Sequence, residues 1–61
     1  MYQVISDPEN TLVFESDDID QAFAVAYSFA MKCVSNAIIW NNRDCIIEET
    51  ICHPANIVEL A

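Results

Sequence analysis

The densest group of side chains that could do chemistry is a run of acids between two phenylalanines, FESDDIDQAF. Its four carboxylates belong to Glu15, Asp17, Asp18 and Asp20. Calcium loops place oxygen ligands at fixed spacings and usually bend at a glycine. This run has neither the glycine nor the distal glutamate. We therefore predict that these acids cap a helix, and that steering a basic partner is their second role.

A second group that could bind a metal consists of Cys45, Cys52 and His53. Structural zinc takes four ligands in paired short spacings, but six residues separate these cysteines and no second pair lies nearby. If Cys52 and His53 lie on a strand, they point to opposite faces. We expect no metal site, with metal-dependent folding through these three residues as an alternative. Cys33 is expected to be a small buried hydrophobe in a helix.

Catalysis has little support in this sequence. His53 is the single histidine and could serve as base for a cysteine nucleophile. The chain contains no glycine, so it has no glycine-rich phosphate loop, and no oxyanion signature is present. A domain of 61 residues also offers little room for a closed pocket. We predict a protein that is not an enzyme and uses no cofactor.

The charge of the chain restricts its partners. Ten acids against Lys32 and Arg43 give a formal net charge of −8. Nucleic acid is bound largely through Lys and Arg that neutralise phosphates, so we expect no direct nucleic-acid binding. An anionic membrane surface would also repel the chain, whereas a basic protein surface would attract it. Because the acids are spread widely along the chain, partial mimicry of nucleic acid is a further hypothesis.

The expected compartment follows from the apolar segments and the cysteines. The most apolar segment, 22–31, is too short to span a bilayer. No signal peptide is recognised, because Met1 leads directly into strand-like sequence. An odd number of cysteines, three, is simplest to explain with reduced thiols. We predict a soluble cytoplasmic protein.

The elements that position these side chains begin with two predicted hairpins. In the first, residues 2–15, β-forming residues flank the turn Asp7–Asn10. In the second, residues 37–52, the segments AIIW and CIIEETI flank the turn Asn41–Asp44. The tail, residues 53–61, fits either a short helical turn or an edge strand.

Between the hairpins, the spacing of apolar residues predicts a helix over residues 18–35. Asp18 is the expected N-cap, with Gln21 three positions later as in a capping box, and Ser16 or Asp17 is the alternative cap. Asn36 is the expected C-cap. The apolar side chains share an arc of about 160° around the axis, which we expect to be buried. This arc contains Ile19, Ala22, Phe23, Ala26, Tyr27, Phe29, Ala30, Cys33 and Val34.

These elements predict a single α+β domain, a two-layer ββαββ sandwich with one helix on an antiparallel sheet. Successive strand residues point to opposite faces, so Val13 faces away from the helix if Leu12 and Phe14 face it. Every strand divides its apolar residues in this way, so apolar side chains are expected on the far face. This face is expected to carry some of Ile5, Val13, Ile39 and Ile46.

A contiguous exposed apolar face usually marks an interaction site. Trp40 and Arg43 lie near one turn, and both residue types are enriched among binding hot spots. The predicted protein-binding set is Ile5, Val13, Ile39, Trp40, Arg43, Ile46 and Glu48. In the alternative, the tail residues Ile57, Val58 and Leu60 fold back and cover this face.

The segment VFESDDIDQAFAVAYSFA has the layout of a strand, an acidic step and a helix that opens with I-D-x-A-x-x-x-A. It resembles small proteins of bacteriophages and other mobile elements that bind and disable a host enzyme, such as the RNA polymerase inhibitors of short-tailed coliphages. The resemblance implies a small acidic inhibitor or modulator of a host protein, acting in the host cytoplasm. Basic residues are nearly absent from the strands here, so no target contacts carry over. The alternative function is a structural domain that forms a homodimer through its apolar sheet face.

Overall fold

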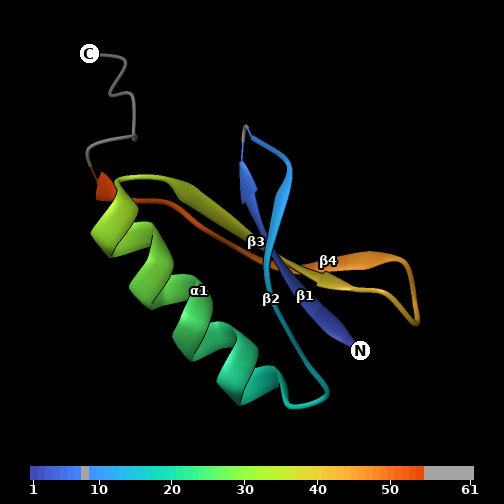
Figure 1. The fold of residues 1–61 in the computed structure, drawn as a ribbon. Coiled ribbons are helices and arrows are strands. Elements are labelled where there is room, and N and C mark those ends of the chain that lie inside the picture. The colour runs from blue at the N-terminus through green and yellow to red at the C-terminus, as the bar shows by residue number, and fades with distance from the viewer. Residues whose placement is uncertain (8, 55–61) are drawn as a thin grey trace.

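The computed structural model describes residues 1–7 and 9–54. Their elements follow one another in the order β1, β2, α1, β3, β4 (Figure 1). The predicted α+β fold with ββαββ order is therefore confirmed. The bounds are β1 Tyr2–Asp7, β2 Thr11–Ser16, α1 Ile19–Cys33, β3 Asn36–Asn41 and β4 Ile46–Ile51. The predictions for the tail concern residues that lie mostly outside the described part of the chain. Residue 8 of the first predicted turn also lies outside it.

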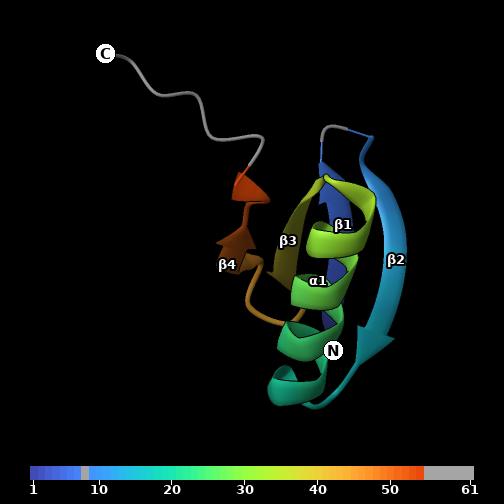
Figure 2. The ribbon, with the colours of Figure 1, turned by 90° about the vertical axis from the view of Figure 1, so that its left-hand side faces the viewer.

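The four strands form one antiparallel sheet in the order β2-β1-β3-β4. The central pair, β1 and β3, comes from opposite halves of the chain and is in register from Tyr2 opposite Asn41 to Asp7 opposite Asn36. Figure 2 shows α1 in front of β1 and β3, with β2 and β4 on either side. The helix contacts β4 least of the four strands. One face of the sheet is therefore covered by the helix.

The core lies between α1 and the two central strands. Val4 and Ile39 are its largest fully buried side chains, and they pair across β1 and β3. The helix contributes only small residues to this centre, since its buried positions are Ala22, Ala26 and Ala30. Alanines spaced four apart lie on one face of a helix and let its backbone approach the sheet closely.

This close approach makes the buried stripe of α1 narrower than the sequence predicts. Of the bulky members of the predicted arc, Phe29 packs against the core, and the others lie beside the alanine contact, where the sheet does not enclose them. Four of them are exposed large hydrophobics, namely Ile19, Phe23, Tyr27 and Val34. Cys33 is also exposed, so its predicted burial is wrong.

The two ends of α1 differ in how well the sequence predicts them. Asp18 is the N-cap, as predicted, and its side chain accepts a hydrogen bond from the Asp20 backbone. The C-cap is Val34 and not Asn36, because the chain must enter β3 at Asn36 to pair with Asp7. Val34 adopts the left-handed conformation with φ 49° and donates its backbone N–H to the Ala30 carbonyl.

Candidate functional site

The sheet face opposite α1 carries a row of apolar residues that crosses three strands. Val4 and Ile39 are buried under the helix, so their strand neighbours Ile5 and Ile38 point away from it. The register places Ile5 directly between Leu12 of β2 and Ile38 of β3. Thr50 of β4 continues the row beyond Ile38.

A second row lies beside the first on the same face. Trp40 follows Ile38 by two residues in β3, pairs with Ile47 of β4, and pairs with Gln3 of β1. Together the two rows form one apolar surface, which we call the outer patch. The outer patch consists of Ile5, Leu12, Ile38, Trp40 and Ile47.

The outer patch is open to solvent at both of its ends. Leu12 is 49% exposed on edge strand β2, and Ile47 is 56% exposed on edge strand β4. The central members Ile5, Ile38 and Trp40 are only partly buried. Among the described residues the one α-helix packs on the opposite face of the sheet. Whether Ile57, Val58 and Leu60 cover this face is a prediction about residues outside the described part.

The predicted far-face residues need correction at three positions. Ile39 is fully buried beneath α1. Ile46 pairs with the buried Asn41 and so lies on the helix side of the sheet. Phe14 pairs with Val4 and Leu12 pairs with Ile5, so Val13 between them has no partner residue in β1. Val13 packs against the core together with Phe14. Only Ile5 of the predicted four lies on the far face.

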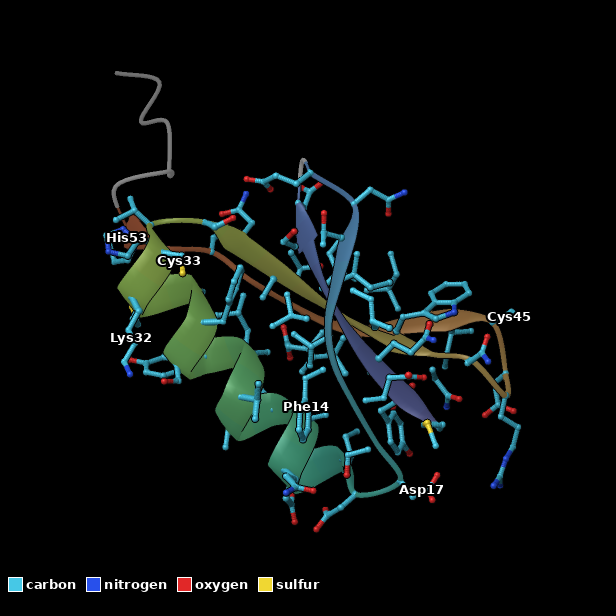
Figure 3. All side chains as sticks on the ribbon, viewed as in Figure 1. Phe14, Asp17, Lys32, Cys33, Cys45 and His53 are labelled. Carbon is cyan, nitrogen blue, oxygen red and sulfur yellow. The ribbon has the colours of Figure 1, made fainter. Side chains whose placement is uncertain are left out.

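The bulge in β2 explains why the alternation argument failed there. A bulge places two residues opposite one, so two successive side chains can share a face. Phe14 pairs with Val4 and points toward α1 in Figure 3, as predicted. Leu12, predicted to join it, instead pairs with the outward Ile5. No local signal in TLVFES identifies this bulge, because the segment reads as an ordinary strand.

Acidic side chains border the outer patch on several strands. Glu15 of β2 accepts a hydrogen bond from Gln3 Nε2 at 3.2 Å, which holds its carboxylate beside the second row. Asp7 follows Ile5 by two residues in β1 and therefore shares its face. In β4, Ile47 pairs with Trp40 and Glu49 pairs with Ile39, so Glu48 between them has no partner residue in β3. The outer patch is thus an apolar surface with acids around it.

The acids at the start of α1 have a mainly structural arrangement. Asp18 Oδ1 accepts the Asp20 N–H at 2.9 Å, and the Asp18 N–H donates to Ser16 Oγ at 3.0 Å. The Ser16 hydroxyl in turn donates to Gln21 Oε1 at 2.8 Å. Gln21 therefore reaches Ser16 and not the Asp18 backbone that a capping box would use. Asp17 and Asp20 are exposed, so their carboxylates face solvent.

The turn between β3 and β4 is organised by the buried side chain of Asn41. Its Oδ1 accepts the N–H groups of Arg43 and Asp44 at 3.0 and 3.2 Å. Its Nδ2 donates to Asp44 Oδ2 at 3.3 Å. These bonds fix the turn and leave the Arg43 side chain exposed.

An open pocket of about 360 Å³ lies beside this turn. It is lined by Met1, Tyr2, Asp17, Asn41, Arg43 and Asp44. Its lining offers carboxylates and a guanidinium but no histidine, cysteine or serine that could act as a nucleophile–base pair. Arg43 shares the pocket with Tyr2 and Asn41, which belong to the helix side of the sheet, whereas Trp40 lies on the other face. A joint role of Trp40 and Arg43 in binding stays a prediction.

The alternative of a metal held by Cys45, Cys52 and His53 does not fit the geometry. Cys45 precedes β4, and the other two residues follow it. Figure 3 shows Cys45 and His53 at opposite ends of this strand. A six-residue strand is about 20 Å long, whereas zinc ligands lie about 2 Å from the ion. Across residues 1–7 and 9–54, no group of three or more His, Cys, Asp or Glu side chains could hold a metal ion.

None of the helices in the described residues is long and apolar enough to cross a membrane. No protein-family profile, curated protein or solved structure matches this chain. The function is therefore inferred from the outer patch and the acids around it.

Proposed function

We propose that this protein is a small acidic binding module that inhibits or modulates another protein by docking through the outer patch. The observation that carries the proposal is the pair of apolar rows that crosses the sheet face opposite α1, which no helix of the described residues covers. Trp40 lies within these rows, and half-exposed Leu12 and Ile47 end them. Interfaces combine such an aromatic and aliphatic centre with a polar rim.

Charge indicates the chemistry of the partner. The chain carries a formal charge of −8, and Asp7, Glu15 and Glu48 lie around the outer patch. The partner surface should therefore be apolar at its centre and basic at its margin. Complementary charges at a rim mainly accelerate association and suppress wrong partners. Association should consequently slow as salt is added.

The same charges weigh against the alternative of a homodimer. An isologous dimer would place the acidic rims of two copies face to face, and two copies at −8 each carry −16. Like charges brought together at an interface are unfavourable. A basic heterologous partner is therefore the better match.

The narrower proposal is that the partner is a host protein and that this chain is a phage-type inhibitor acting in the host cytoplasm. It is supported by the small acidic domain and by the layout of VFESDDIDQAFAVAYSFA. Partial mimicry of nucleic acid would contribute if the basic surface of the target normally binds phosphates.

The test is capture of bacterial proteins by the wild type and by three matched variants. Leu12→Asp and Ile47→Asp each place a charge in the outer patch. Tyr27→Asp places the same charge on α1, at 55% exposure against 56% for Ile47. Circular dichroism checks that every variant is folded.

We expect both patch variants to lose the captured protein by at least about tenfold, and Tyr27→Asp to retain it. Identical capture by all four proteins would show that the outer patch is not the docking surface. Native mass spectrometry at micromolar concentration distinguishes the alternative, because a stable dimer of the wild type that Ile47→Asp dissociates would support self-association.

A further inference from the structure

Strand β4 is an edge of the sheet, and its outer side has no strand partner among the described residues. Four of its six residues are exposed, including Ile46 at 48% and Ile47 at 56%. The helix contacts this strand least. An accessible edge with free backbone donors and acceptors is a template for another extended segment.

The other edge, β2, is less available. Val13 and Phe14 pack against the core, so the helix side of this strand is occupied. Glu15 and Ser16 are already hydrogen-bonded to Gln3 and to Gln21. An incoming strand therefore meets fewer competing contacts at β4.

The charges of β4 discriminate between the segments that could pair with it. Glu48 and Glu49 occupy its middle. If a second copy added antiparallel to β4 about a twofold axis at the middle of the strand, either Glu48 or Glu49 would lie opposite the same residue of the other copy. Like charges directly opposite one another destabilise a strand pair, whereas opposite charges stabilise it. The edge is thus unfavourable for self-pairing and favourable for lysine or arginine.

The size of the sheet face also points to the edge. Four six-residue strands have a flat footprint of about 19 by 20 Å, or roughly 380 Å². A standard interface buries about 800 Å² of accessible surface on each partner. Protruding side chains make the accessible area of the face larger than its flat footprint, but a standard interface would still cover the whole face and extend past its border. Ile47 belongs to both the outer patch and β4, so the two surfaces are continuous.

We infer that the partner contributes an extended basic segment, which pairs with the outer side of β4 as a fifth strand. Its lysines or arginines lie on the helix side of the sheet beside Glu49, which pairs with buried Ile39, and its apolar residues continue the outer patch beside Ile47 on the other face. This inference rests on the proposed function, because the added strand is part of the same docking surface. Strand addition of this kind obtains affinity from main-chain hydrogen bonds and specificity from alternate side chains.

The test uses the full-length protein, labelled for NMR, and synthetic capped peptides of alternating lysine and valine. The first comparator is the same peptide with alternate backbone nitrogens methylated, which cannot pair with an edge. The second comparator alternates glutamate and valine. We expect the lysine–valine peptide to shift β4 resonances and to slow hydrogen exchange in β4. We expect each comparator to bind at least about tenfold more weakly.

A double variant and its matched control separate local pairing from general charge attraction. Glu48→Lys with Glu49→Lys should weaken the lysine–valine peptide by at least about tenfold. Glu9→Lys with Asp17→Lys changes the net charge equally, at exposed positions outside β4, and should weaken it far less. Equal losses would overturn the inference, because they would show attraction without pairing.

Three further results would also overturn it: no binding of the lysine–valine peptide, equal binding of the methylated peptide, or β4 amides already protected at an occupied edge in the free protein. Failure of the inference is distinguishable from failure of the proposed function. Capture that depends on Leu12 but not on Glu48 and Glu49 refutes only the edge. Peptide pairing at β4, with capture unchanged in Leu12→Asp, refutes only the outer patch.

Discussion

The alanine stripe of α1 predicts a sharp contrast between two substitutions on the same helix. Ala26 is fully buried against the sheet, whereas Ala24 is exposed two residues away. Replacing Ala26 with leucine inserts a branched side chain where the helix backbone approaches β1 and β3. Overpacking of this kind costs about 1–3 kcal/mol. Ala24→Leu adds the same atoms in solvent and should change the free energy of unfolding by less than about 0.5 kcal/mol.

The size of the domain makes this contrast measurable. At about 0.05–0.15 kcal/mol per residue, a chain of 61 residues has a free energy of unfolding of roughly 3–9 kcal/mol. A loss of 1 kcal/mol lowers the Tm of such a domain by about 4–8 °C. Urea unfolding followed by circular dichroism gives both free energies. If Ala26→Leu and Ala24→Leu unfold at the same urea concentration, the close approach of α1 to the sheet is refuted.

Three further substitutions test local features of the structure by the same urea assay. Val34→Gly should raise the free energy of unfolding by about 0.5–1 kcal/mol. A residue other than glycine costs about 1–2 kcal/mol in the left-handed conformation, and the greater conformational entropy that glycine loses on folding offsets part of this gain. No gain would argue against the left-handed cap. Asn41→Ala should cost about 1–3 kcal/mol, since it removes the buried acceptor of the β3–β4 turn, while exposed Asn42→Ala should cost little. Equal effects would exclude that role of Asn41. Asp18→Ala should cost about 1 kcal/mol through loss of the N-cap, and Asp17→Ala should not; the reverse order would place the cap at Asp17.

Local signals in the sequence predicted the elements of this fold well. The N-cap at Asp18 depends on a bond to Asp20, only two residues away. The turn at Asn41–Asp44 depends on bonds from one side chain to the next few backbone groups. Such contacts are determined by neighbouring residues, so their pattern is visible before folding. The same holds for the helical spacing of the alanines.

The surface of the candidate site was predicted less well, because it depends on contacts between distant segments. The shift at Val13 arises where β2 pairs with β1, and it turned Leu12 outward and Val13 inward. Ile38 was missed because the burial of Ile39 under α1 decides which residues of β3 face outward, and Ile47 was missed because its face depends on its pairing with Trp40 beside a register shift. Cys33 was misplaced because the width of the buried helical stripe depends on how closely the helix approaches the sheet.

The sequence alone determined the acidic character, the ββαββ order and the excess of apolar strand residues over what one sheet face can bury. Composition and local periodicity are sufficient for these properties. The tertiary structure decided which apolar residues remain outside, namely the outer patch of Ile5, Leu12, Ile38, Trp40 and Ile47. The physical reason is that strand side chains alternate with a period of two, so one bulge or one shift in register exchanges the faces.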